Sequence, residues 1–109
     1  MKVAAVPADE QERLAALHET CLLDTLPEDV YDDLTKLAAL VTGAPIALVS
    51  LVDSSRQWFK ARVGLDATET PRDVAFCSHA ILERGPFIVA DALADDRFFD
   101  NPLVTGPPG

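Results

Sequence analysis

Two adjacent segments with the hydrophobic patterns of paired β-strands constrain the fold of this chain more than any other feature. Residues 46–52 are apolar at nearly every position, as in a strand that is covered on both faces. Turn-forming residues follow at 53–55, and residues 56–63 then alternate between two sets of side chains. One set is Gln57, Phe59, Ala61 and Val63, and the other is Arg56, Trp58, Lys60 and Arg62. The pattern predicts an antiparallel hairpin, with the basic set on a solvent-facing edge surface.

Two helices are predicted before this hairpin. The first spans residues 9–22, with Asp9 and Glu12 in capping-box positions and an apolar stripe that includes Leu14, Leu17, Cys21 and Leu22. The second follows the linker 23–27, begins with a second capping pattern at Thr25 and Glu28 that places Pro27 in its first turn, and ends near Gly43. Its apolar face consists of Val30, Leu34, Leu37, Ala38 and Val41.

Fewer helices and strands are predicted in the second half of the chain. After a loop at 64–70, a third helix is expected from Thr70 to about Glu83, and a third strand at 87–90. One helical turn is expected near 95–98, and no further element up to Pro107-Pro108-Gly109. The order, two helices, a hairpin, a helix and a strand, indicates an α+β fold. Because the last strand has no evident neighbour, part of the sheet is expected to be missing or supplied from elsewhere.

Composition excludes several classes of function. Hydrophobic residues make up 49% of the chain and charged residues 25%, which is typical of a globular domain. The net charge of −9 argues against a surface that binds nucleic acid or an anionic membrane. Half of the acids lie within residues 1–33, where a solvated helical surface is the expected structure.

The N-terminal residues and the cysteines indicate a cytoplasmic protein. The segment after Met1 is too short for the apolar core of a signal peptide, and no apolar run is long enough for membrane insertion. Cys21 and Cys77 are far apart and show no metal-type spacing, so neither a disulfide framework nor a metal site is predicted. No glycine-rich phosphate loop and no catalytic triad or zinc-protease motif is present.

A series of motifs runs along almost the whole chain, at residues 12–14, 22–25, 32–35, 45–53, 56–60, 69–73, 76–81 and 100–104. These motifs resemble bacterial GAF domains of sensor histidine kinases and diguanylate cyclases. The resemblance implies a PAS-like α+β fold, an antiparallel sheet flanked by helices. Residues 8–26 correspond to an N-terminal helix and linker, and residues 27–109 to the GAF core.

The resemblance also implies that the domain is incomplete. Members of the family continue beyond the segment equivalent to 104–106 into two further strands and a closing helix. Residues 1–109 are therefore expected to form a single GAF domain truncated at its C-terminus, roughly the N-terminal two-thirds of the family's fold.

Cys77 and His79 are the residues of this chain best suited to catalysis or metal binding. A thiol beside an imidazole can act as a nucleophile with its base, or as a pair of metal ligands. Two positions apart on a helix, however, side chains point to opposite sides, which favours structural roles for both. Bilin-binding GAF domains use an adjacent Cys-His pair, and because Ser78 intervenes here, no bilin attachment is expected.

In the GAF family a small molecule binds between the sheet and its covering helices and loops. The residues expected to contact it are Trp58, Arg72, Phe76, Cys77 and His79. Trp58 among bases can stack on an anionic or planar ligand, although an exposed strand surface is the simpler interpretation. Arg72 is expected either to pair with an acid at the rim of the pocket or to contact a ligand carboxylate. No ligand or cofactor is specified by these residues.

The function that the resemblance implies is a ligand-sensing regulatory module of a cytoplasmic signal-transduction protein, with a kinase or cyclase output domain, as in two-component systems. A homodimer is expected through the first helix, at Leu14, Leu17 and Cys21. No catalytic residue is predicted. Two alternatives remain open: reduction of free methionine sulfoxide by Cys77, which needs a second thiol, and a ligand-free interaction or dimerisation fragment.

Overall fold

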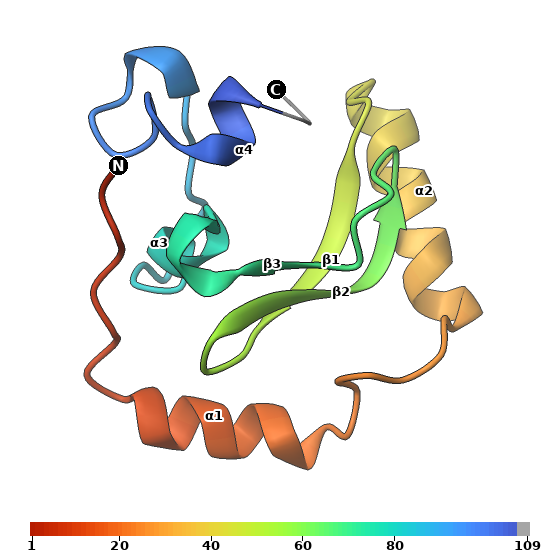
Figure 1. Cartoon of the computed structure of the whole chain (residues 1–109). Coiled ribbons are helices and arrows are strands. Elements are labelled where there is room, and N and C mark those ends of the chain that lie inside the picture. The colour runs from red at the N-terminus through yellow and green to blue at the C-terminus, as the bar shows by residue number, and fades with distance from the viewer. Residues whose placement is uncertain (107–109) are drawn as a thin grey trace.

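A computed structural model describes residues 1–106 of the chain, as a three-stranded antiparallel sheet with helices around it (Figure 1). The strands β1 (Ala47–Val52), β2 (Arg56–Val63) and β3 (Glu69–Pro71) lie side by side in that order. The predicted hairpin of β1 and β2 is confirmed, and so is the α+β fold of antiparallel sheet and helices. The prediction for Pro107–Gly109 concerns positions outside the described residues.

The pairing of β1 with β2 contains a β-bulge. Ser50 pairs with Phe59 and Val49 with Ala61, which leaves Lys60 as an extra residue in β2. Directly paired residues lie on the same face of a sheet, so the two alternating sets of β2 exchange faces beyond this bulge. The prediction of unbroken alternation along 56–63 is therefore wrong at the C-terminal end of the strand.

Trp58 and Lys60 of the basic set do not form the solvent-facing edge surface predicted for them, whereas Arg62 is exposed. β2 is the central strand, and only 8% of Trp58 and 3% of Lys60 are exposed. The linker before the second helix crosses this strand and supplies three acceptors for the Lys60 ammonium: Thr25 Oγ1 at 2.6 Å, the Leu26 carbonyl at 2.6 Å and Glu28 Oε2 at 2.7 Å. Because each ammonium hydrogen has a partner, the charge is accommodated in the interior.

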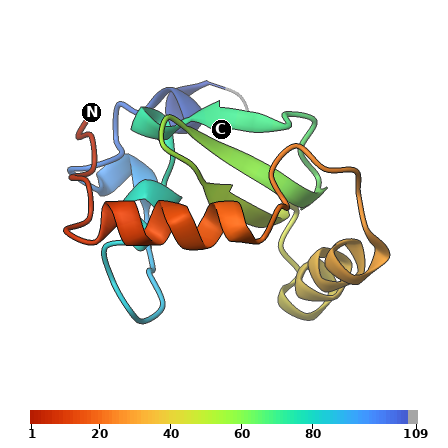
Figure 2. The ribbon, with the colours of Figure 1, turned by 90° about the horizontal axis from the view of Figure 1, so that it is seen from below.

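Helix α1 (Glu10–Glu19) is shorter than predicted and lies across the end of the sheet where the β1–β2 turn projects (Figures 1 and 2). Asp9 occupies the N-cap position without a side-chain hydrogen bond to the helix. Cys21 lies beyond the helix in a left-handed conformation, with φ of 54°. The predicted stripe of Leu14, Leu17 and Cys21 is therefore not continuous on one helix, because the chain leaves the helix before Cys21.

Helix α2 (Asp29–Thr42) ends at Gly43 as predicted, where φ of 69° suits a residue without a side chain. Its start differs from the prediction. The N-cap is Glu28, and Thr25 and Pro27 lie before the helix. Thr25 cannot cap α2 because its hydroxyl is engaged elsewhere: it donates to the Leu22 carbonyl and accepts from Lys60.

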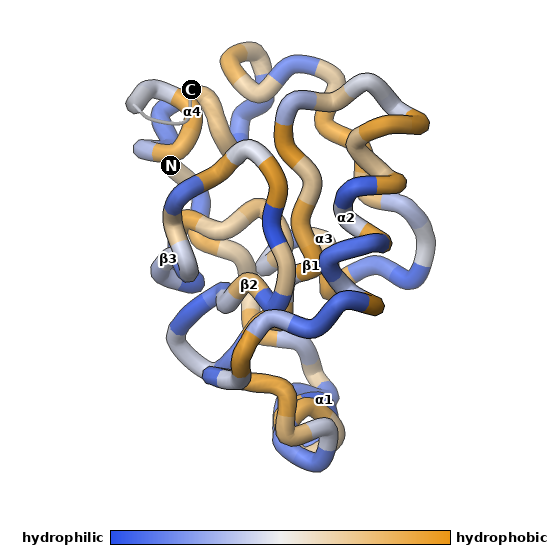
Figure 3. Tube along the Cα trace, turned by 90° about the vertical axis from the view of Figure 1, so that its right-hand side faces the viewer, coloured by the Kyte–Doolittle hydropathy of each residue, from blue (hydrophilic) through white to orange (hydrophobic). Residues whose placement is uncertain are grey.

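The apolar face predicted for α2 lies on the outside of the molecule, where apolar segments recur along the helix in Figure 3. Val30, Leu34, Leu37 and Val41 are all more than half exposed, whereas Thr35 is only 2% exposed. Thr35 satisfies its own hydroxyl by donating to the Asp32 carbonyl at 2.8 Å, so this small side chain allows α2 to approach the sheet closely.

The chain after β2 departs most from the predictions. The expected helix from 70 to 83 is replaced by β3, a 3-10 turn η1 (Arg72–Val74) and the short helix α3 (Cys77–Ala80). Thr70 pairs with Gln57 in the sheet, and Ala75 is extended, so the helical pattern is interrupted on both sides of η1. Because the residues at the start of the predicted helix pair with β2 as strand β3, only later residues of this segment form helical turns.

The C-terminal segment contains short turns rather than a strand. Residues 87–90 form no strand in the described part of the chain, contrary to the prediction. Two short elements follow, η2 (Ala92–Ala94) and α4 (Pro102–Thr105), the second of which was not predicted. Between them, Phe98 N–H donates to the Asp95 carbonyl at 3.0 Å, which matches the helical turn expected near 95–98.

Candidate functional site

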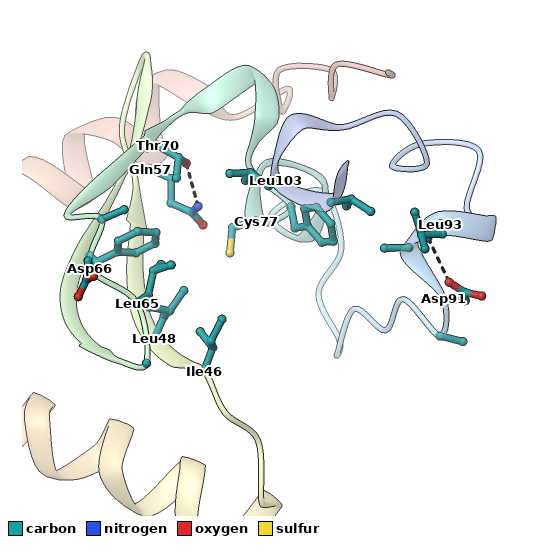
Figure 4. Close-up of a pocket in the computed structure, with 17 residues that line it drawn as sticks. Ile46, Leu48, Gln57, Leu65, Asp66, Thr70, Cys77, Asp91, Leu93 and Leu103 are labelled. Carbon is teal, nitrogen blue, oxygen red and sulfur yellow. Dashed lines mark hydrogen bonds between the residues drawn. The ribbon is translucent and has the colours of Figure 1, made fainter. Parts of the chain in front are cut away.

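A cavity of about 930 Å³ lies between the sheet and the C-terminal segment (Figure 4). On the side of the sheet, the cavity is lined by Ile46, which immediately precedes β1, and by Leu48 in β1. Gln57 and Phe59 of β2 complete this wall. The opposite wall is formed around η2 and α4, by Ala92, Leu93, Leu103 and Val104. The loop after β2 adds Leu65 and Asp66, and Phe76 and Cys77 close the end next to α3. A largely apolar hollow of this size, with a few polar groups, is typical of small-molecule sites.

A buried asparagine holds the C-terminal wall of this cavity in place. Asn101 is 2% exposed, and its Oδ1 accepts from Leu103 N–H at 2.8 Å, which caps α4. Its Nδ2 donates to the Val74 carbonyl at 2.9 Å and so ties α4 to η1. Each hydrogen-bonding group of the carboxamide is therefore used to position the wall.

An aromatic cluster fastens the same segment to α3. Phe98 is 1% exposed, stacks on Phe76 with ring centroids 4.0 Å apart, and meets the edge of His79 at 5.0 Å. The Arg97 guanidinium lies over the Phe98 ring at 5.2 Å. Hydrogen bonds from Arg97 to Asp95 lower the pKa of that carboxyl to about 2, so the pair stays ionised at neutral pH.

Cys77 and His79 are directed to different surroundings. The Cys77 Sγ lies at the cavity, 3.3 Å from Ser50 Oγ (Figure 4). His79 belongs to the aromatic cluster, is 9% exposed, and has Nε2 3.1 Å from the Lys2 carbonyl oxygen. The structure therefore does not bring the thiol and the imidazole together as a catalytic or metal-binding pair.

Trp58 and Arg72 do not line the cavity. Trp58 neighbours the cavity residues Gln57 and Phe59 in the strand, so its side chain points to the other face of the sheet. Arg72 pairs with an acid, which was one of its two expected roles, but that acid is Glu10 on α1. Of the residues expected to contact a ligand, Phe76 and Cys77 are at the cavity.

Most cavity residues were missed by the sequence analysis. Gln57 was the one with a visible signal, since it is the only amide in a strand set that otherwise contains Phe59 and Ala61. Leu93 and Leu103 carried no such signal, because their position depends on how the C-terminal segment folds back. Leu65 lies two residues after the end of β2 and reaches the cavity because Gly64 turns the chain, with φ of 79°.

Helix α1 is connected to the sheet and to η1 by a carboxylate that two arginines share. Glu10 accepts from Arg13 at 2.7 Å and from Arg72, and Arg72 also donates to the Asp53 carbonyl at 3.1 Å. Hydrogen bonds from Arg72, and then from Arg13, lower the pKa of Glu10 to about 2. The N-terminal end of α1, the β1–β2 turn and η1 are thus joined at one point.

A smaller hollow of about 490 Å³ separates α1 from α3. Arg13 and Leu17 of α1 lie on one side of it, and Ile81 lies on the other. Cys77 lines both this hollow and the main cavity, so it stands between the cavity and α1. Leu14 and Leu17 are half-buried, whereas Cys21 is exposed.

Within residues 1–106, no group of three or more His, Cys, Asp or Glu side chains is arranged to hold a metal ion. No helix within that range has both the length and the apolar character needed to cross a membrane.

The fold and the cavity define an α+β domain with a ligand-sized hollow beside its sheet. Residues 26–109 match the GAF domain family, and the chain belongs to this family. It is also similar to a cyclic di-GMP phosphodiesterase of Pseudomonas aeruginosa, with 44% identity over 108 residues. That match covers 99% of this chain and 18% of the relative, so the chain spans less than a fifth of the relative's length.

Proposed function

We propose that this GAF domain is a small-molecule-sensing regulatory module of a cytoplasmic signal-transduction protein. The observation that carries the proposal is the cavity of about 930 Å³ beside the sheet. Its volume suits a small organic ligand, and its walls come from segments that are far apart in sequence. A ligand that contacts both walls stabilises their arrangement, because it binds that arrangement more tightly than any other.

The output that we propose is a domain that makes or degrades a cyclic dinucleotide. The similarity to a cyclic di-GMP phosphodiesterase supports this choice over a histidine kinase, which remains the alternative. The domain is expected to act within a homodimer, and α1 is the element that connects it to the partner or to the output domain.

The contacts around Cys77 and Arg72 provide a route from the cavity to α1. Cys77 contacts the ligand space on one side and the hollow next to α1 on the other. Arg72, five residues earlier, holds Glu10 of α1. A ligand that shifts the segment from η1 to α3 therefore acts on α1 at both its Leu17 and Glu10 positions.

The test is to fill the cavity in the protein that carries this domain. Leu48→Trp places an indole in the cavity, and Leu40→Trp makes the same change on the exposed surface of α2, where Leu40 is 81% exposed. We expect Leu48→Trp to fix cyclic di-GMP turnover at one level, whatever cell extract or metabolite is added, and Leu40→Trp to leave the response unchanged. Equal responses in both variants and the parent would contradict the proposal.

A redox function of Cys77 is the second candidate, because its thiol faces the cavity 3.3 Å from the Ser50 hydroxyl. Reduction of methionine sulfoxide forms a sulfenic acid on the attacking thiol, which a second thiol converts to a disulfide with loss of water. Cys21, the other free cysteine, is exposed beyond α1. Turnover of free methionine sulfoxide with a dithiol reductant, lost in Cys77→Ala, would favour this candidate over sensing.

A further inference from the structure

The charged groups at the cavity are all acidic. No lysine, arginine or histidine is among the described residues that line it, whereas Asp66 and Asp91 are. Arg62 pairs with Leu48 and so lies on the same side of the sheet, but it is exposed and does not line the cavity. Phosphate and carboxylate ligands are bound in proteins by arginine, lysine or clustered backbone N–H groups. The lining is therefore suited to a neutral or cationic ligand.

One side-chain oxygen at the cavity has no protein partner among the described residues. Gln57 is 5% exposed, and its Nε2 donates to Thr70 Oγ1 at 3.1 Å. No donor among the described residues reaches its Oε1, which is directed toward the cavity beside Cys77 in Figure 4. This oxygen belongs to a side chain that is otherwise buried and is open to the cavity, so it is an acceptor for a ligand that offers an N–H or O–H group.

We propose that the ligand of this cavity is a neutral or cationic, mainly apolar molecule that donates a hydrogen bond to Gln57 Oε1, and not a phosphate or carboxylate compound. This inference rests on the proposed ligand-sensing function and adds the chemical class of the ligand. The apolar body contacts Leu48, Phe59 and Leu93, and the Asp66 and Asp91 carboxylates act at the rim.

Four related probes separate charge from hydrogen bonding: indole, 1-methylindole, tryptamine and indole-3-acetate. They share one apolar ring system and differ in the N–H donor or in a cationic or anionic side chain. Each is titrated at neutral pH and low salt into the isotope-labelled full chain, and the shifts of the Cys77, Leu93 and Leu103 amide resonances report binding in the cavity. The variants are Gln57→Met, the double variant D66N/D91N, and Arg62→Ala.

We expect tryptamine to bind about tenfold more tightly than indole-3-acetate, since two rim carboxylates attract one probe and repel the other. In D66N/D91N this ratio falls to about twofold, while indole itself is unaffected. We expect 1-methylindole to bind about fivefold more weakly than indole, because it leaves Gln57 Oε1 unpaired, and Gln57→Met to remove that difference. Asn at position 91 retains the oxygen that caps η2, so D66N/D91N keeps the fold.

Two results would overturn the inference in distinguishable ways. Tighter binding of indole-3-acetate than of tryptamine, especially if lost in Arg62→Ala, shows that the ligand class is wrong although the cavity binds ligands. Absence of shifts at the cavity with all four probes at millimolar concentration contradicts both the ligand class and the proposed sensing function.

Discussion

Single buried polar residues hold segments that are distant in sequence in place. Asn101 caps α4 and ties it to η1, and Lys60 fixes the linker before α2 through three acceptors. Both are inside the molecule because every polar group has a partner, and a buried polar group that loses its partner costs about 1–3 kcal/mol. Asn101 acts on the site without lining the cavity, since it determines where the C-terminal wall lies.

Replacing Asn101 tests this role at the level of one side chain. Asn101→Ala removes the cap of α4 and the bond to the Val74 carbonyl, and we expect a loss of about 2–3 kcal/mol in unfolding free energy. Asn101→Ser keeps a capping oxygen and removes the donor to Val74, so it should lose about 1 kcal/mol less than Asn101→Ala. Urea denaturation measures both. Equal losses in the two variants would show that the cap of α4 contributes nothing.

At the scale of elements, α2 shows how a helix can turn its most apolar stripe outward. Leu34 and Leu37 are 53% and 55% exposed, and the side turned to the sheet carries Thr35. The position of the helix is set by the linker that Lys60 holds and by the hairpin that it contacts, and these restrict how it can rotate. In the described chain, nothing covers the exposed stripe. Exposed apolar patches of this kind are common at contacts between molecules.

The exposed stripe predicts unusual tolerance to polar substitution. We expect Leu34→Gln and Leu37→Gln to change the unfolding free energy by less than about 1 kcal/mol, because each leucine remains more than half exposed in the fold. Thr35→Leu, by contrast, should lose about 1–3 kcal/mol by overpacking the contact with the sheet. Chemical denaturation at two protein concentrations gives the comparison. A loss of more than 1.5 kcal/mol in the leucine variants that depends on concentration would indicate that the stripe is buried between copies of the chain.

At the scale of the whole molecule, ionic contacts join helix α1 to the rest of the domain. Glu10 is held by Arg13 and Arg72, and at the other end of the turn Arg56 pairs with Asp24 at 2.7 Å. These contacts connect α1, the linker, the β1–β2 turn and η1. The acidic N-terminal region is thus partly neutralised by arginines from the sheet and η1, and α1 is bound more by charge than by apolar burial.

This arrangement predicts a specific dependence of stability on pH. The pKa of Glu10 is lowered from 4.5 to about 2 in the fold, so its stabilisation is complete above pH 4.5 and is lost as the pH falls through about 2. We expect Glu10→Gln to be less stable than the parent by about 1 kcal/mol at neutral pH, after allowance for solvent screening. The two proteins should converge between pH 4.5 and 2.

Thermal unfolding across that range is the measurement, with Glu12→Gln as the control. Glu12 lies on the same helix and is exposed, and no ion pair involves it in residues 1–106. The control should follow the parent at every pH. A constant difference between Glu10→Gln and the parent down to pH 2 would show that the carboxylate charge is not what holds α1.

The sequence by itself determined the elements whose signals are local. The β1–β2 hairpin, the α+β fold and the end of α2 at Gly43 follow from hydrophobic period, turn residues and a glycine in left-handed conformation. The motifs also indicated the family, which the match at residues 26–109 established. Such features could be predicted because they depend on neighbours within a few residues along the chain.

Only the tertiary structure decided which faces are buried and which residues share the cavity. The bulge at Lys60, the pairing of Thr70 with Gln57 and the outward stripe of α2 each depend on contacts between distant segments. The same reason explains why Trp58 and Arg72 are absent from the cavity while Gln57 and Leu93 are present. Hydrogen-bond satisfaction of buried groups and the docking of the C-terminal segment select among arrangements that local patterns leave equally favourable.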